Sequence, residues 1–181
     1  MSEAQPNPIP RGNTPIIGIV GAGVTGTAVG RALVRRGVRV AWFDPRVGAA
    51  VRAAGRIGGV PVDDVRDLEA ADAVVIAAPP GHARTAERLL GEGLHVVSTT
   101  DDLDDVRGLL FLDHVAKRHG VSLVVGAALC PGLSGLLAAR LAGQLHVVDE
   151  IHVAMHGTGG PACARQHHDA LGNTSSAWHD G

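Results

Sequence analysis

Short apolar runs alternate with longer amphipathic stretches over residues 15–126, and this alternation predicts strands and helices in turn. The predicted strands lie at 16–20, 38–43, 73–78, 95–98 and 121–126, with a shorter, proline-containing candidate at 58–62. The first predicted helix follows Gly26, and the second occupies 47–54 and is stopped by Gly55. Further helices are predicted at 81–90 and at 103–119, and the latter stretch holds either one helix or two helices around Gly108. Strands and helices that alternate at this pace predict an α/β fold with a doubly wound, mostly parallel sheet.

A glycine-rich turn joins the first predicted strand to the first predicted helix. It reads Gly21-Ala22-Gly23-Val24-Thr25-Gly26. Gly21 permits the tight turn, Gly23 lets a pyrophosphate approach the backbone, and Gly26 brings helix and strand together. The helix N-terminus offers N–H groups and a positive dipole end to phosphates. The alternative interpretation is that the glycines only serve a tight turn, but the strand, the helix and the following acid favour a Rossmann dinucleotide site.

The acid that completes this pattern is Asp44, at the end of the second predicted strand. A carboxylate there accepts both ribose hydroxyls of an adenosine and repels a 2′-phosphate, which favours NAD over NADP. Arg46 lies two residues further on and is able to accommodate a 2′-phosphate. The sequence therefore predicts NAD as the cofactor and keeps NADP as the alternative.

Ligands of doubly wound sheets bind beyond the carboxyl ends of the strands, and this rule extends the candidate site. The prolines after Ala78 would hold the backbone extended beneath the cofactor, or would simply stop the strand, two interpretations of equal weight. His82 lies beside them at the mouth of the site. The predicted cofactor-binding residues are Gly21, Ala22, Gly23, Val24, Thr25, Gly26, Asp44, Pro45, Arg46, Ala78, Pro79, Pro80, His82, Thr99, Thr100, Cys130, Pro131 and Gly132.

The pattern changes after Gly132. An amphipathic helix is predicted at 133–141, a strand of a different sheet at 147–156, and a helix at 162–171 with Pro161 suited to its first position. We therefore expect three regions: a flexible N-terminal tail at 1–14, the Rossmann dinucleotide-binding domain at 15–143, and the incomplete start of a substrate or dimerisation domain at 144–181.

Composition narrows the class of protein. The chain has 181 residues, of which 45% are hydrophobic and 2% aromatic, so the core is built from aliphatic side chains. A net charge of −2 without a basic stripe argues against a nucleic-acid partner. The N-terminus lacks the apolar stretch of a signal peptide, and no apolar run is long enough to span a membrane. Two cysteines fit a reducing compartment, so we expect a cytoplasmic protein.

Two cysteines carry alternative chemistry. Cys163 and His167 lie four residues apart on a predicted helix, so their side chains share one face and could bind a metal ion together. His156 or His168 could supply a third ligand. Packing of Cys163 as a small hydrophobe is the favoured interpretation, and no metal site is predicted. Cys130 could act as a thiol nucleophile, although a pocket-lining role is favoured because no base accompanies it.

The order of these motifs resembles that of saccharopine dehydrogenase-like oxidoreductases. More distant relatives are diaminopimelate dehydrogenase, dihydrodipicolinate reductase and homoserine dehydrogenase. The resemblance covers about residues 15–160. The motifs that carry it are the glycine turn, Ala77-Ala78-Pro79-Pro80, Val97-Ser98-Thr99-Thr100 and Cys130-Pro131-Gly132-Leu133-Ser134.

This resemblance implies an NAD(P)-dependent hydride transfer at an amino-, imino- or hydroxyl-bearing carbon of a small, amino-acid-like substrate. It places the Pro131-Gly132 turn near the nicotinamide, and it implies a mainly β substrate domain that often forms the interface of a homodimer. A histidine suits proton transfer near neutral pH, and His167 and His168, reminiscent of a histidine pair in the reductase, are the predicted catalytic residues. The alternative is a non-catalytic dinucleotide-binding module or the N-terminal domain of a longer enzyme.

Overall fold

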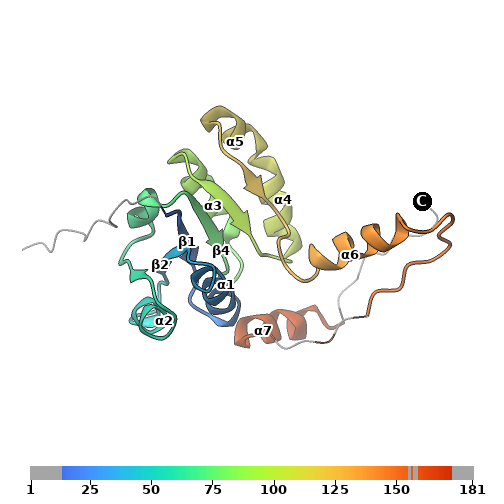
Figure 1. The fold of residues 1–181 in the computed structure, drawn as a ribbon, viewed down its shortest axis with the longest axis horizontal. Helices are drawn as coiled ribbons and strands as arrows, with labels where there is room; N and C mark the ends of the chain where they lie inside the picture. Colours follow the sequence, from blue (N-terminus) through green and yellow to red (C-terminus); the bar gives the residue numbers. More distant parts are fainter. Residues whose placement is uncertain (1–13, 155, 157–158, 173–181) are drawn as a thin grey trace, which may run out of the picture.

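A parallel β-sheet forms the centre of the protein in a computed structural model that describes residues 14–154, 156 and 159–172. Within these residues the sheet has six strands in the order β3-β2-β1-β4-β5-β6 (Figure 1). The strands are β1 (Ile16–Val20), β2 (Arg39–Phe43), β3 (Val60–Pro61), β4 (Ala73–Ile76), β5 (His95–Ser98) and β6 (Leu123–Val124). Every pair is parallel, and β1 pairs with both β2 and β4. The predicted doubly wound α/β fold of Rossmann type is confirmed.

Helices cover both faces of the sheet. The covering helices are α1 (Val24–Val34), α2 (Ala49–Ile57), the 3-10 helix η1 (Val65–Ala70), α3 (His82–Gly91), α4 (Leu103–Phe111) and α5 (Asp113–His119). Two further helices, α6 (Leu133–Ala142) and α7 (Pro161–Ala170), lie beside the sheet (Figure 1). On one face Trp42 and Ile19 pack beneath α1 and α2. On the other face Val74 and Ile76 pack against η1, α3, α4 and α5. Strand β1 pairs with β2 on one side and with β4 on the other, so the loop after β1 lies where the strand order reverses.

Two local predictions were wrong at element ends. The second helix continues through Gly55, where an added Cβ would meet nothing within 4 Å. It is ended instead by Gly58, its C-cap, whose φ of +104° turns the chain. The break between α4 and α5 falls at Leu112 rather than at Gly108. Gly108 instead permits close packing, because a Cβ there would lie 2.9 Å from the Cβ of Ala83 on α3.

The strand predicted at 147–156 is not formed in its described residues, 147–154 and 156. No described neighbouring strand offers backbone hydrogen bonds to this segment, so apolar alternation alone does not produce one. Pro161 opens α7 as predicted. Residues 1–13, most of the predicted tail, lie outside the described residues, as do residues 173–181. No helix in the described part of the chain is both long and apolar enough to cross a membrane.

Candidate functional site

A cleft of about 350 Å³ lies at the carboxyl ends of β1, β2, β4 and β5. It contains most of the predicted cofactor-binding residues: Gly21, Gly23, Val24, Thr25, Asp44, Pro45, Arg46, Ala78, Pro79, Pro80, Thr99 and Thr100. Ala77, Asp101 and residues 160–163, 165 and 166 of α7 and its approach complete the lining. The cleft therefore brings together strand ends up to 80 residues apart in sequence, as expected at the point where the chain reverses across such a sheet.

The three motif glycines have different surroundings. Gly21 has a φ of +104°, and a Cβ on it would collide with the Ala77 carbonyl. A Cβ on Gly26 would collide with the carbonyl oxygen of Gly21, so α1 packs tightly on the loop. A Cβ on Gly23 would meet nothing within 4 Å. Because Gly23 also lines the cleft, open space lies directly against its backbone.

Helix α1 begins at this open position. Its N-cap is Gly23, which has no side chain to satisfy the first N–H groups, and its first turn has no acidic residue. The Thr27 side chain does not cap these N–H groups either, since its hydroxyl donates to the Gly23 carbonyl at 2.7 Å. The exposed amides and the positive end of the helix dipole are features that bind phosphate groups.

Asp44 lies beside the loop, with its side chain only 3% exposed. The Ala22 N–H donates to its Oδ2 at 2.8 Å, so the carboxylate holds the glycine turn in place. The Arg46 guanidinium covers the remaining surface, with Nε 2.9 Å from Oδ1 and Nη2 2.7 Å from Oδ2. Burial raises the pKa of the Asp44 carboxyl, but the hydrogen bonds from Arg46 and Ala22 outweigh it and lower the pKa to about 2.

His82 does not line the cleft, in contrast to the predicted cofactor contact. Its side chain is 1% exposed and lies beneath the loop after β4. Nε2 lies 2.8 Å from the Ala78 carbonyl oxygen, and Nδ1 lies 2.8 Å from the Ser98 hydroxyl. A carbonyl only accepts, so Nε2 carries the proton and Nδ1 accepts from Ser98. His82 therefore supports the loop from below.

A second support for this loop is Asp105, on α4, which the sequence did not single out. It accepts from the Gly81 N–H at 2.8 Å and from the Ala83 N–H at 3.2 Å. Although burial raises the pKa of Asp105, hydrogen bonds from the first N–H groups of α3 lower it below its ordinary value. A carboxylate reaching from a neighbouring helix thus caps α3, an arrangement without a local sequence signal.

Residues of helix α7 line one part of the cleft. In the ribbon this helix lies beside α1 (Figure 1). Gly160, its N-cap, lies next to Val24 at the start of α1. At the other side the Gln166 amide donates to Asp101 at 3.2 Å. Cys163, Arg165 and Gln166 line the cleft, whereas the predicted catalytic residues His167 and His168 are exposed and do not.

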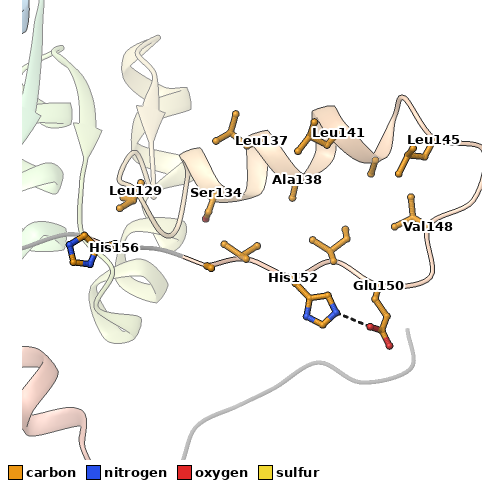
Figure 2. A pocket seen from close by; sticks show the side chains of 14 residues that line it. Leu129, Ser134, Leu137, Ala138, Leu141, Leu145, Val148, Glu150, His152 and His156 are labelled. Carbon is orange, nitrogen blue, oxygen red and sulfur yellow. Dashed lines mark hydrogen bonds and ion pairs between the residues drawn. The ribbon is translucent and has the colours of Figure 1, made fainter.

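The turn formed by Cys130, Pro131 and Gly132 also lies outside the cleft lining. Pro131 follows a cis peptide bond, and Cys130 is exposed. This turn leads into α6, which lies alongside residues 145–154 (Figure 2). Between them is a second, mainly apolar hollow of about 560 Å³, lined by residues such as Leu137, Leu141 and Ile151. No described residue of α6 is buried.

The described residues contain no group of three or more His, Cys, Asp or Glu side chains placed to hold a metal ion. The Cys163 side chain lies close to Gly159, since a Cβ added to that glycine would lie 3.2 Å from the Cys163 sulfur.

Comparisons with known proteins agree with the geometry of the cleft. Residues 16–101 match the family model described as NADP oxidoreductase, coenzyme F420-dependent. A glycerol-3-phosphate dehydrogenase [NAD(P)+] from Hyphomonas neptunium is 37% identical over 90 residues, which are 42% of this chain and 27% of that protein. The dinucleotide-binding part of the chain is thus similar in sequence to NAD(P)-dependent oxidoreductases.

Solved structures share the fold. The WlbA dehydrogenase from Bordetella pertussis, in complex with NADH and UDP-GlcNAcA, is 24% identical with a TM-score of 0.59, covering 73% of this chain and 42% of that one. A 3-ketoreductase from Actinomadura kijaniata in complex with NADP is 24% identical with a TM-score of 0.58, covering 72% and 44%. The chain therefore spans less than half the length of these relatives. The predicted coenzymes, NAD or NADP, are those of the relatives, whereas the saccharopine dehydrogenase-like assignment stays a prediction.

Proposed function

We propose that the chain binds NAD(P) in the cleft and forms the coenzyme-binding part of an NAD(P)-dependent oxidoreductase. The open backbone at Gly23, at the uncapped start of α1, is the observation that carries the proposal. The pyrophosphate would lie against Gly23 and Val24, with the adenosine ribose toward Asp44 and the nicotinamide toward Ala78 and Thr99. The nicotinamide, when bound, supplies the hydride chemistry, and the chain's own residues bind and orient it.

The proposed substrate is a small, amino-acid-like molecule that reacts at an amino-, imino- or hydroxyl-bearing carbon, as in saccharopine and homoserine dehydrogenase-like enzymes. His167 or His168 is the proposed proton donor. The preceding turn of their helix lines the cleft, which supports a position near the substrate. Both imidazoles are exposed in this structure, so proton transfer would require α7 to turn or another segment to cover it.

A non-catalytic dinucleotide-binding module is the second candidate function. It is favoured by one observation: the described lining of the cleft contains no histidine. Both candidates share the coenzyme site. In either case residues 144–181 would begin a substrate or dimerisation region, which is supported by the apolar hollow between α6 and the following segment.

Calorimetric titration of the 181-residue chain with NADH and with NADPH tests the shared step. We expect saturable binding of at least one dinucleotide, and its loss in the Gly23→Val protein. Absence of binding of both by the folded chain would overturn the proposed function.

A further inference from the structure

A second recess opens beside Asp44, between α1 and α2. Its volume is about 190 Å³, several times the roughly 30 Å³ that one water occupies in the liquid, so a phosphate-sized group fits it. Four arginines line it: Arg31 from α1, Arg46 from the loop after β2, and Arg52 and Arg56 from α2. The other lining residues, Ala22, Thr27, Ala49, Ala53 and Ile57, are uncharged, so the recess is strongly positive.

Three of these arginines are not neutralised by the described part of the protein. Arg46 forms its ion pair with Asp44. Arg31, Arg52 and Arg56 form no ion pair or side-chain hydrogen bond with any described residue. Arg52 and Arg56 lie one helical turn apart on α2, so both side chains reach the same side of the recess. Like charges gathered without a counter-charge favour an anionic ligand.

The recess adjoins the coenzyme cleft. Arg46 lines both hollows, and the backbone of Ala22, which lines the recess, donates to the Asp44 carboxylate. A ribose bound beside Asp44 would thus lie at the boundary between cleft and recess. The anion that can reach the arginines from this position is one attached to that ribose.

In the sequence, the Asp44 carboxylate was expected to repel a 2′-phosphate, but in the structure this carboxylate is already paired. The Asp44 side chain is 3% exposed, and Arg46 and the Ala22 amide donate hydrogen bonds to both of its oxygens. Asp44 and Arg46 together carry no net charge, which leaves the three unpaired arginines to set the local potential. The preference for NAD was inferred from Asp44 alone, on the assumption that its carboxylate is unpaired. Its ion pair with Arg46 removes that assumption.

We propose that this arginine recess binds the 2′-phosphate of NADP(H) and makes the chain selective for NADP(H) over NAD(H). The proposal rests on the proposed coenzyme site and adds the group that distinguishes the two dinucleotides. Arginine guanidinium groups form bidentate, charge-assisted hydrogen bonds with phosphate oxygens. Arg31, Arg52 and Arg56 supply these contacts, while Arg46 keeps Asp44 covered.

The test compares dissociation constants for NADPH and NADH, measured by calorimetry on the full chain and on the Arg52→Gln/Arg56→Gln variant. Arg35→Gln is the matched control, since Arg35 is exposed at the end of α1 and does not line the recess. We expect the chain to bind NADPH at least about tenfold more tightly than NADH, because even one charge-assisted hydrogen bond is worth that factor. The double variant should lose this preference while its NADH affinity changes by less than about twofold. Arg35→Gln should keep the preference.

Four results would overturn the inference. NADH binding as tightly as NADPH to the unaltered chain, with Gly23→Val abolishing both, would leave the coenzyme site standing and remove the 2′-phosphate site. Equal weakening of both dinucleotides by the double variant would show a non-specific charge effect. Binding of neither dinucleotide would instead overturn the proposed function itself. Competition by 2′,5′-ADP but not by inorganic phosphate at the same concentration would support a ribose-linked phosphate, and the reverse would show a general anion site.

Discussion

Arg46 covers the carboxylate of Asp44 through two hydrogen bonds, from Nη2 to Oδ2 at 2.7 Å and from Nε to Oδ1 at 2.9 Å. The arginine is 67% exposed, whereas the aspartate is almost completely buried. Both residues of the pair line the coenzyme cleft. The pair also fixes the glycine turn, because the same carboxylate accepts from the Ala22 N–H.

Acid should weaken the fold through this pair. The folded pKa of Asp44 is lowered to about 2 from an ordinary 3.8, so its stabilisation is complete above about pH 5 and is lost as the pH falls toward 2. This pKa difference corresponds to at most about 2 kcal/mol of unfolding free energy, and solvent screening at the exposed Arg46 reduces it. Urea unfolding at pH 6 and at pH 2.5 should show a smaller loss of stability in Asp44→Asn than in the unaltered chain. Asp113→Asn, in an exposed pair with Lys117, is the control and should change the curve by less than about 0.5 kcal/mol.

Substitution of Gly23 should separate binding from folding. A valine there fits the folded chain, because no atom lies within 4 Å of the added Cβ, but it occupies the space proposed for the pyrophosphate. We expect Gly23→Val to keep its melting temperature within a few degrees and to lose dinucleotide binding by calorimetry. Gly91→Val is the matched control: Gly91 ends α3 and is equally open, so binding should persist. Unchanged affinity in folded Gly23→Val would refute the site.

His82 should contribute to stability rather than to coenzyme contact. Removing its imidazole leaves the Ala78 carbonyl and the Ser98 hydroxyl without their partner in a buried position. His82→Ala is expected to lower the free energy of unfolding by about 2–4 kcal/mol in urea titrations. His114→Ala, at an exposed position where Nδ1 meets the Phe111 carbonyl, should lower it by less than about 1 kcal/mol. Similar losses for both variants would contradict the supporting role of His82.

Much of the fold and of the coenzyme loop could be predicted from sequence, because both depend on local patterns. Apolar runs identified the strands, and the positions of Gly21, Gly23 and Gly26 relative to β1 and α1 follow from backbone sterics. The strand at 147–156 was predicted by the same rule and failed, since a strand also needs a partner. Alternating apolar residues do not reveal whether one exists.

The rest of the site arises from contacts between distant segments. Asp105 caps α3 from α4, and Gln166 reaches Asp101 across 65 residues. The arginine recess likewise combines α1, α2 and the loop after β2. Each of these residues has an ordinary surface position in the sequence pattern. Only the packing of α2 against α1 places Arg31 beside Arg52 and Arg56, so the charge cluster has no signature along the chain.

His167 and His168 should be dispensable for coenzyme binding. Both side chains are exposed on α7 and lie outside the described lining of the cleft. We expect the His167→Ala/His168→Ala protein to bind NADPH and NADH within about twofold of the unaltered chain, as usual for surface substitutions. A loss of tenfold or more would show that the pair contacts the coenzyme, contrary to a role confined to substrate chemistry.

The apolar hollow beside α6 gives the proposed homodimer a test. Leu141 is 61% exposed and lines this hollow together with Ile151. Burial of such a leucine against a second copy contributes about 1.5–3 kcal/mol, so a glutamate there should weaken dimerisation by about tenfold or more. We expect light scattering during gel filtration to show a dimer for the unaltered chain and a monomer for Leu141→Glu. Leu110→Glu is the matched control, because Leu110 is 63% exposed on α4, away from the hollow, and should remain dimeric. A monomer for the unaltered chain at high concentration would contradict the homodimer. Loss of the dimer in both variants alike would contradict an interface at α6.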